Sequence, residues 1–87
     1  MTTDQIHSKL ATIIADKIDS HIAPEHVTLD SRLREDLGID SLAVAEMLYE
    51  IEETFGATLE VSDPQTLLTV RDAVNAIALE LRLPVAN

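Results

Sequence analysis

Apolar residues recur at three- and four-residue steps in the first part of this chain, which is the period of an amphipathic α-helix. Thr2 and Gln5 have the spacing of a capping box, the pattern that starts many helices. The apolar positions that follow are Ile6, Leu10, Ile13, Ile14 and Ile18. The pattern fades near Ser20. We therefore predict a first helix that begins near Thr2 or Thr3 and ends before Pro24.

The same helical period returns in the middle of the chain. Asp40 is a good N-cap, and Gly56 is a good residue to follow a helix C-terminus. We therefore predict a second helix from about Ser41 to Phe55. Its core-facing stripe consists of Val44, Met47, Leu48, Ile51 and Phe55. The opposite face combines acidic and apolar side chains and consists of Leu42, Glu46, Tyr49 and Glu53.

Two further helices are indicated near the end of the chain. Ser62-Asp63-Pro64 has the pattern of a helix start and predicts a short third helix that ends near Leu67-Leu68. Thr69 and Asp72 then open a last helix with capping-box spacing, and Pro84 ends it. The core face of this last helix consists of Val70, Ala73, Val74, Ile77 and Leu81.

Residues 22–40 show no clean period and predict a long loop. A loop of this length is uncommon in a compact domain unless it is functional or pinned, and we expect a short helical turn within it. The apolar residues that can pin it to the core are Val27, Leu29, Leu33 and Leu37. The sequence thus predicts one all-α domain over residues 1–87. We expect an antiparallel four-helix bundle with three longer helices, one short helix and the long loop between the first two.

The charge balance restricts the partners that this domain can have. The formal net charge is −10, from 16 acidic and 6 basic residues. This charge argues against nucleic acid and anionic membranes as partners, and it favours a monomer that meets proteins with basic patches. The chain has no cysteine for a disulfide or a zinc site, and no apolar run approaches the length of a membrane span. Because the amino terminus also lacks the features of a secretion signal, we expect a cytoplasmic protein.

Ser41 is the best candidate for a functional residue. The chain has no cysteine, no dense histidine cluster and no glycine-rich phosphate loop, so any reactive group must be attached from outside. Ser41 falls at the first position of the predicted second helix, where unpaired amide groups favour an anion such as a phosphate ester. Gly38 leaves room near its hydroxyl. Serine is also common at helix starts, so this position alone does not define a function.

The remaining polar candidates do not have the spacing of a metal site. His7 is expected on a helix surface, and His21 and His26 flank a loop. Asp36 and Asp40 lie close in sequence without the ligand pattern of a calcium loop. We therefore expect no metal site and no catalytic residue.

A set of residues that spans nearly the whole chain resembles one known family. These residues are Leu33, Asp36-Leu37-Gly38, Asp40-Ser41-Leu42, Glu46, Glu52-Glu53-Thr54-Phe55-Gly56, Leu59, Asp63, Leu67 and Thr69-Val70-Arg71-Asp72-Ala73. With them the chain resembles the acyl carrier proteins. The resemblance implies that Ser41 receives 4′-phosphopantetheine from coenzyme A through a phosphopantetheinyl transferase. It also implies that the terminal thiol of this arm holds acyl groups as thioesters, while the protein itself performs no chemistry.

The same resemblance implies a set of partners and a surface that meets them. The partners are acyltransferases, ketosynthases or other acyl-processing enzymes of fatty-acid, polyketide or related biosynthesis. Asp40 would assist the attachment by positioning the serine for the transferase. The residues that would face partner enzymes are Leu42, Glu46, Tyr49 and Glu53.

Two positions differ from the fatty-acid carriers with which the chain can be compared. Ala43 stands where those carriers often have an acidic residue, and Tyr49 stands where they often have methionine. These differences favour a dedicated carrier of a secondary pathway such as a polyketide system. An aminoacyl or peptidyl carrier of the same fold stays open, as does an acidic helical adaptor without a cofactor. A small apolar pocket could form among Val44, Leu48, Leu59 and Leu67.

The charge excess leads to a first prediction about stability. Sixteen acidic residues on 87 positions repel one another in the compact state, and salt screens this repulsion. We expect the melting temperature to rise when sodium chloride or magnesium chloride is added to a low-salt buffer. Differential scanning calorimetry over a salt series measures this shift, and a melting temperature indifferent to salt would contradict it.

Overall fold

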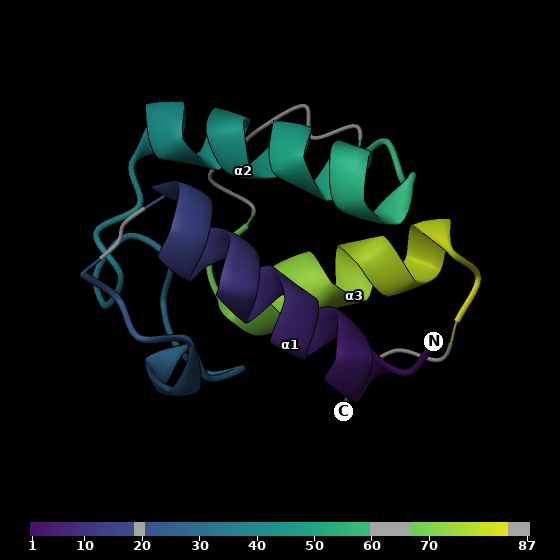
Figure 1. The fold of residues 1–87 in the computed structure, drawn as a ribbon, viewed down its shortest axis with the longest axis horizontal. Coiled ribbons are helices and arrows are strands. Elements are labelled where there is room, and N and C mark those ends of the chain that lie inside the picture. The colour runs from purple at the N-terminus through teal and green to yellow at the C-terminus, as the bar shows by residue number, and fades with distance from the viewer. Residues whose placement is uncertain (19–20, 60–66, 84–87) are drawn as a thin grey trace.

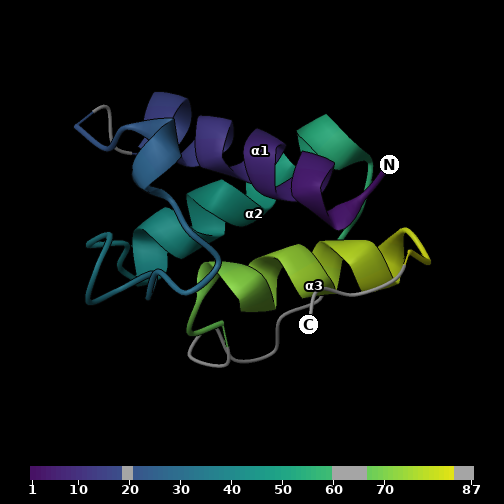
Figure 2. The same cartoon turned by 90° about the horizontal axis from the view of Figure 1, so that it is seen from below.

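The structure, a computed structural model, describes residues 1–18, 21–59 and 67–83. Within these ranges the α-helices are α1 (Thr3–Ile13), α2 (Ser41–Phe55) and α3 (Val70–Glu80), with a 3-10 turn at Pro24–His26 in the long loop, as expected. Figures 1 and 2 show that α2 and α3 run in the same direction and that α1 runs opposite to both. α1 packs against α3, and both α1 and the π-helical turn Ile14–Ile18 that follows it pack against α2. The all-α class is confirmed.

α1 begins at the predicted cap and ends in an unpredicted turn. Gln5 N donates to Thr2 Oγ1 at 3.2 Å, and Thr2 N donates to the side-chain oxygen of Gln5 at 2.8 Å. After Ile13 the chain continues as a π-helical turn, Ile14–Ile18, where the sequence predicts regular α-helix. The turn begins within a stretch in which residues 13–15 are all buried, although an α-helix directs consecutive side chains about 100° apart.

An aliphatic core lies between the three helices. Its fully buried large side chains are Ile6, Leu10, Ile14, Val27, Leu33, Met47, Ile51, Val70, Val74 and Ile77. α2 directs Val44, Met47 and Ile51 into this core, as predicted, while Leu48 and Phe55 are partly buried against it. Burial of one such side chain stabilises the fold by about 1.5–3 kcal/mol. The stripe therefore fixes the rotation of α2 and leaves its opposite face exposed.

The helix ends follow their local signals. α2 ends where predicted, because Gly56 adopts a φ of 67° and its N–H donates to the carbonyl of Glu52. α3 begins after the predicted Thr69 cap and ends at Glu80, about one turn earlier than predicted. The short helix predicted over residues 62–68 lies outside the described residues, apart from its last two positions.

The long loop before α2 is pinned to the core and to α1. Val27 and Leu33 are buried, and Leu29 and Leu37 are partly buried, which confirms the predicted pinning. His7 donates from its Nε2 to the carbonyl oxygen of Val27. His7 lies on α1 as predicted, but it is half-buried, because the loop passes close enough to supply a backbone acceptor.

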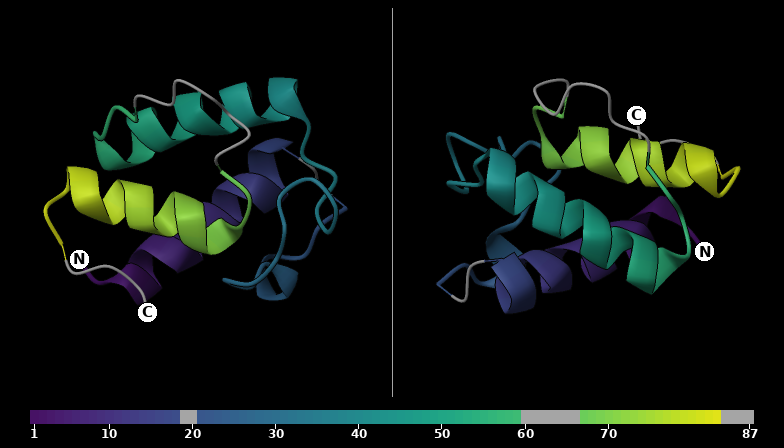
Figure 3. Two further views of the ribbon diagram at one scale, coloured as in Figure 1. Left: turned by 180° about the vertical axis from the view of Figure 1, so that it is seen from behind. Right: turned by 90° about the horizontal axis from the view of Figure 1, so that it is seen from above.

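Backbone hydrogen bonds fasten the same loop to the start of α3. Leu33 N donates to the carbonyl of Leu68 at 2.9 Å, and Val70 N donates to the carbonyl of Ser31 at 3.0 Å. Figure 3 shows the loop lying beside the first turns of α2 and α3 at one end of the bundle. Each of these bonds satisfies a backbone group that would otherwise need water. The loop is therefore attached to α1 at Val27 and to the start of α3 at Ser31 and Leu33.

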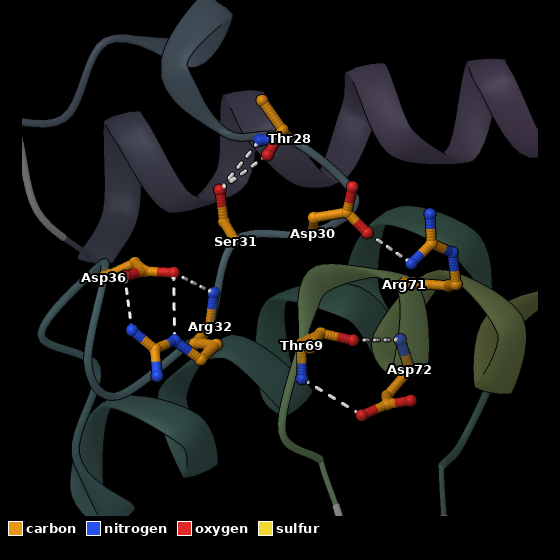
Figure 4. A network of polar contacts seen from close by, with 8 residues as sticks. All are labelled: Thr28, Asp30, Ser31, Arg32, Asp36, Thr69, Arg71 and Asp72. Carbon is orange, nitrogen blue, oxygen red and sulfur yellow. Dashed lines mark hydrogen bonds and ion pairs between the residues drawn. The ribbon is translucent and has the colours of Figure 1, made fainter.

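Side chains add to this attachment, as Figure 4 shows. Arg71 forms an ion pair with Asp30 of the loop, and Arg71 N donates to the carbonyl of Leu29 at 2.9 Å. Thr69 and Asp72 form the predicted capping box, with Thr69 N donating to Asp72 Oδ2 at 3.0 Å. The cap of α3 and the ion pair thus stand side by side at the point where the loop crosses.

A second polar cluster, which the sequence analysis did not foresee, closes the loop on itself. Arg32 N donates to Asp36 Oδ2 at 2.7 Å, and the guanidinium of Arg32 lies 3.4 Å from Asp36 Oδ1 (Figure 4). Glu35 Oε2 lies 3.5 Å from Arg32 Nε. The backbone hydrogen bond from Arg32, followed by the side-chain hydrogen bond, holds the pKa of Asp36 below its usual range. Ile39 N then donates to the carbonyl of Leu33 at 2.8 Å and directs the chain toward α2.

This cluster predicts a pH dependence. Because the pKa of Asp36 is lowered in the folded state, its contribution to stability is present above about pH 4, the range of the unfolded value, and is lost as the pH falls through the folded pKa. We expect NMR titration of the carboxyl carbon to give a lowered pKa for Asp36. Arg32→Gln should raise this pKa only part of the way, because the main-chain donor remains.

Measurements of thermal stability test the same contribution of Asp36. Asp36→Asn should lower the melting temperature at pH 7, and its difference from the unsubstituted protein should narrow below about pH 4. Glu25→Gln removes one exposed carboxylate from the 3-10 turn and controls for the change in net charge. A difference for Asp36→Asn that stays constant into the acid range would contradict the assignment.

Candidate functional site

Ser41 is the first residue of α2, and its side chain is exposed. The preceding Asp40 is the N-cap: its Oδ1 accepts from Ala43 N at 2.9 Å, and its carbonyl accepts from Val44 N at 2.8 Å. The Asp40 carboxylate is therefore committed to the helix start. In the described part of the chain the Ser41 hydroxyl has no hydrogen-bond partner, so it is open to a reagent that approaches from solvent.

The turn that leads into this site requires a glycine. Gly38 adopts a φ of 68°, a left-handed conformation that L side chains rarely adopt, and its N–H donates to the carbonyl of Arg34 at 3.0 Å. A Cβ built on Gly38 would meet no atom within 4 Å. Gly38 is thus needed for its backbone conformation, and not for the space that was expected of it, because a Cβ would fit there.

A pocket of about 220 Å³ opens beside Ser41 and Asp40. Its apolar wall comes from the loop, from α2 and from the residues before α3, and consists of Leu33, Ile39, Val44, Leu67 and Leu68. Arg34 and Glu35 complete the lining with charged side chains. A flexible apolar chain that is attached to Ser41 could therefore lie in this pocket and leave a charged group near its mouth.

The predicted lining of an apolar pocket is correct in part. Val44 and Leu67 line the pocket beside Ser41, whereas Leu48 and Leu59 do not, because both pack against the core. Helical periodicity assigned the correct side of α2, but it carries no information about which loop residues cover that side. The loop's contribution, including Leu33, depends on the hydrogen bonds to the start of α3.

The outer face of α2 is as exposed as the sequence predicted. Leu42 is 70% exposed and Tyr49 is 60% exposed, so α2 presents two large side chains with apolar surface to solvent. Glu46 and Glu53 are exposed on the same helix. Acidic groups next to exposed apolar side chains suit an interaction surface, because charge guides the approach and apolar contact supplies affinity.

The described residues contain no group of three or more histidine, cysteine, aspartate or glutamate side chains that could hold a metal ion. His7 contacts the loop backbone, while His21 and His26 are exposed and stand apart from Ser41 in sequence. No helix in the described ranges is long and apolar enough to cross a membrane.

Comparison with known proteins assigns the class of this chain. Residues 8–77 match the family model described as "Phosphopantetheine attachment site". The chain is 39% identical over 77 residues to the acyl carrier protein of Borrelia garinii subsp. bavariensis, covering 88% of this chain and 94% of that protein. The acyl carrier protein of Rickettsia bellii is 39% identical over 74 residues, covering 85% of this chain and 84% of that protein.

A solved structure gives the same answer. The acyl carrier protein from Enterococcus faecalis superimposes with a TM-score of 0.71 at 32% identity, covering 92% of this chain and 99% of that one. The fold and the matched region define a phosphopantetheine-bearing carrier. The chain belongs to the acyl carrier protein family, and its cofactor is 4′-phosphopantetheine.

The geometry of this end of the molecule fits that cofactor. An exposed serine hydroxyl offers an attachment atom, the helix start favours the negative charge of a phosphate group, and the apolar pocket can receive a flexible arm. In an acidic chain such as this one, the N-terminus of α2 opposes the negative charge that attachment would add.

Proposed function

We propose that this protein holds acyl groups as thioesters on a 4′-phosphopantetheine arm attached to Ser41 and presents them to partner enzymes. The observation that carries the proposal is the Ser41 hydroxyl, which is exposed, unpartnered among the described residues and placed at the first position of α2 beside the apolar pocket. Ser41 also lies within the region that matches the attachment-site family. The terminal thiol of the arm supplies the thioester chemistry, which the cysteine-free chain does not have.

The attachment reaction uses coenzyme A as the donor and a phosphopantetheinyl transferase as the catalyst. Ser41 Oγ forms a bond to the phosphorus that bears the pantetheine, and the pyrophosphate bond of coenzyme A breaks. Adenosine 3′,5′-bisphosphate leaves, and the hydroxyl proton passes to a base of the transferase. Asp40 assists by capping α2, which fixes the position of the neighbouring Ser41.

The outer face of α2 supports a set of basic partners. Leu42 and Tyr49 offer apolar anchors, and Glu46 and Glu53 offer charges that attract positive patches. The partners in this proposal are the transferase and acyltransferases, ketosynthases or other acyl-processing enzymes. The net charge of −10 opposes self-association and supports a monomer.

Two residues support a secondary pathway, such as polyketide biosynthesis, over primary fatty-acid synthesis. Ala43 reduces the charge at the start of α2, and Tyr49 enlarges the exposed apolar anchor. A surface of this kind suits a small set of dedicated partners better than a large set reached through charge alone. An aminoacyl carrier of the same fold would show itself by accepting activated amino acids on the thiol.

Loading with the cofactor tests the proposal directly. The purified protein is incubated with coenzyme A, magnesium and a promiscuous phosphopantetheinyl transferase, and its intact mass is measured. We expect a gain of one phosphopantetheine in the unsubstituted protein and no gain in Ser41→Ala. Ser8→Ala removes another exposed helical hydroxyl and should load fully, which makes it the matched control.

The other outcomes are equally clear. Loading of Ser41→Ala would move the attachment point to another residue. An unloaded protein, in a tube where a known carrier becomes loaded, would favour the adaptor function. In that case, a partner should still bind Ser41→Ala with unchanged affinity.

The partner surface leads to a separate prediction. Leu42→Ala and Tyr49→Ala should each raise the KM of the transferase for this protein by roughly 5–30-fold, because exposed anchors at a protein interface contribute about 1–2 kcal/mol. The melting temperature should change little, since both side chains are exposed. Leu79→Ala is the control, because Leu79 is 66% exposed on α3. Steady-state loading kinetics measure the effect, and wild-type KM values in both α2 variants would disprove this surface.

A further inference from the structure

Arg34 is the cationic side chain that lines the pocket beside Ser41. Its backbone is fixed there, because its carbonyl accepts the N–H of Gly38 in the turn that leads to Asp40. Its side chain is exposed and forms no ion pair with another described residue. A guanidinium in this position has donors and positive charge that no other described residue pairs with.

The neighbouring charges explain why Arg34 has no ion-pair partner among the described residues. Arg32, two positions earlier, pairs with both acidic side chains that follow Arg34. Its guanidinium lies 3.4 Å from Asp36 (Figure 4) and 3.5 Å from Glu35. Asp40 lines the same pocket, but its carboxylate caps α2 through Ala43 N. Each carboxylate close to Arg34 in sequence therefore already has a donor.

Attachment of the cofactor changes this balance. The phosphodiester adds a negative charge next to Asp40, in a chain whose formal charge is already −10. The added repulsion needs an opposing charge, and a guanidinium can donate two parallel hydrogen bonds to two phosphate oxygens. Among the cationic residues of the described chain, only Arg34 lines the pocket at Ser41.

We propose that Arg34 binds the phosphodiester of the Ser41 prosthetic group and thereby holds the start of the arm at the mouth of the adjacent pocket. This inference rests on the proposed attachment at Ser41. The contact would direct the arm along the apolar wall that includes Leu67 and Leu68 instead of into solvent. Arg34 thus acts as a binding residue for the arm, with no part in acyl transfer.

The test uses the fully loaded protein with a free thiol, in which the phosphodiester is the only anion that loading adds. We would record phosphorus-31 NMR spectra of the unsubstituted protein, Arg34→Gln, Arg34→Lys and Arg82→Gln. Arg82 is exposed and follows α3 at the end away from the start of α2, as Figures 1 and 2 show for these helices, so it controls for the loss of one positive charge. Mass spectrometry confirms complete loading of each variant beforehand.

We expect the phosphorus resonance to shift in Arg34→Gln, to shift less in Arg34→Lys and to stay in place in Arg82→Gln. In the unsubstituted protein the Nε–H signal of Arg34 should move on loading, and 0.5 M salt should reverse part of the change. The melting-temperature difference between the loaded and unloaded forms should become less favourable by about 1–5 °C in Arg34→Gln. A merely structural role would instead alter the unloaded form.

Two results would overturn the proposal. The first is an identical phosphorus resonance in Arg34→Gln and the unsubstituted protein, with an Arg34 Nε–H signal unchanged by loading. The second is a phosphorus shift of equal size in Arg82→Gln, which would reflect net charge alone. Failure of the attachment itself is visible separately, as the absence of a mass gain in the unsubstituted protein, and it would remove both proposals together.

Discussion

The backbone pairing between residues 29–33 and residues 68–71 is the constraint on which the functional end of this molecule depends. It joins the long loop to the start of α3 through Leu33 N, Val70 N and Arg71 N, each within 3.0 Å of its acceptor. The pairing places Leu33 and Leu68 on the wall of one pocket, and the carbonyl of Leu33 then holds Ile39 just before α2. Without it, the loop over residues 22–40 would have few reasons to adopt one path.

The ion pairs around this backbone pairing connect different segments of the chain. Arg71 is paired with Asp30 and fastens the loop to α3, while Arg32 bridges Glu35 and Asp36 and closes the loop on itself. These exposed pairs contribute little energy, because solvent screens them. Their value lies in position, since together they hold the carboxylates of Asp30, Glu35 and Asp36 in ion pairs within the loop and with α3. An acidic protein can in this way leave one end suited to a further negative charge.

The helices could be predicted from residues that lie a few positions apart. Contacts between distant positions could not, because they leave no pattern in the sequence. Asp40, Gly56 and the stripe of α2 obey rules that depend only on residues within a few positions, so capping and rotation followed from the sequence. The hydrogen bond from His7 to the loop joins positions twenty residues apart, and backbone donors leave no mark in the side-chain pattern. The π-helical turn Ile14–Ile18 likewise reflects the burial that tertiary packing imposes.

Some residues of the candidate site could likewise be predicted from the sequence, and others could not. Ser41, Leu42 and Tyr49 were identified because helical spacing assigns each residue to a face, and their exposure agrees with it. The attachment role itself came from the family resemblance, since a serine at a helix start is ordinary. Arg34 escaped notice, because a single arginine in a loop has no pattern, and its importance depends on which pocket it lines. The Arg32–Asp36 cluster had a recognisable four-residue spacing, but that spacing is informative mainly within helices.

The distribution of apolar and polar contacts also bears on how such a carrier can work. A chain of 87 residues has a small core, and here the core is concentrated where α1 meets α3 and α2. The end that contains Ser41 adds hydrogen bonds and exposed ion pairs to the buried side chains of Leu33 and Ile39, and such surface contacts open at lower cost than an aliphatic core. The pocket beside Ser41 is walled partly by this loop, whereas Met47 and Ile51 are packed in the core. The residues that form the core and the residues that line the pocket therefore overlap only in part.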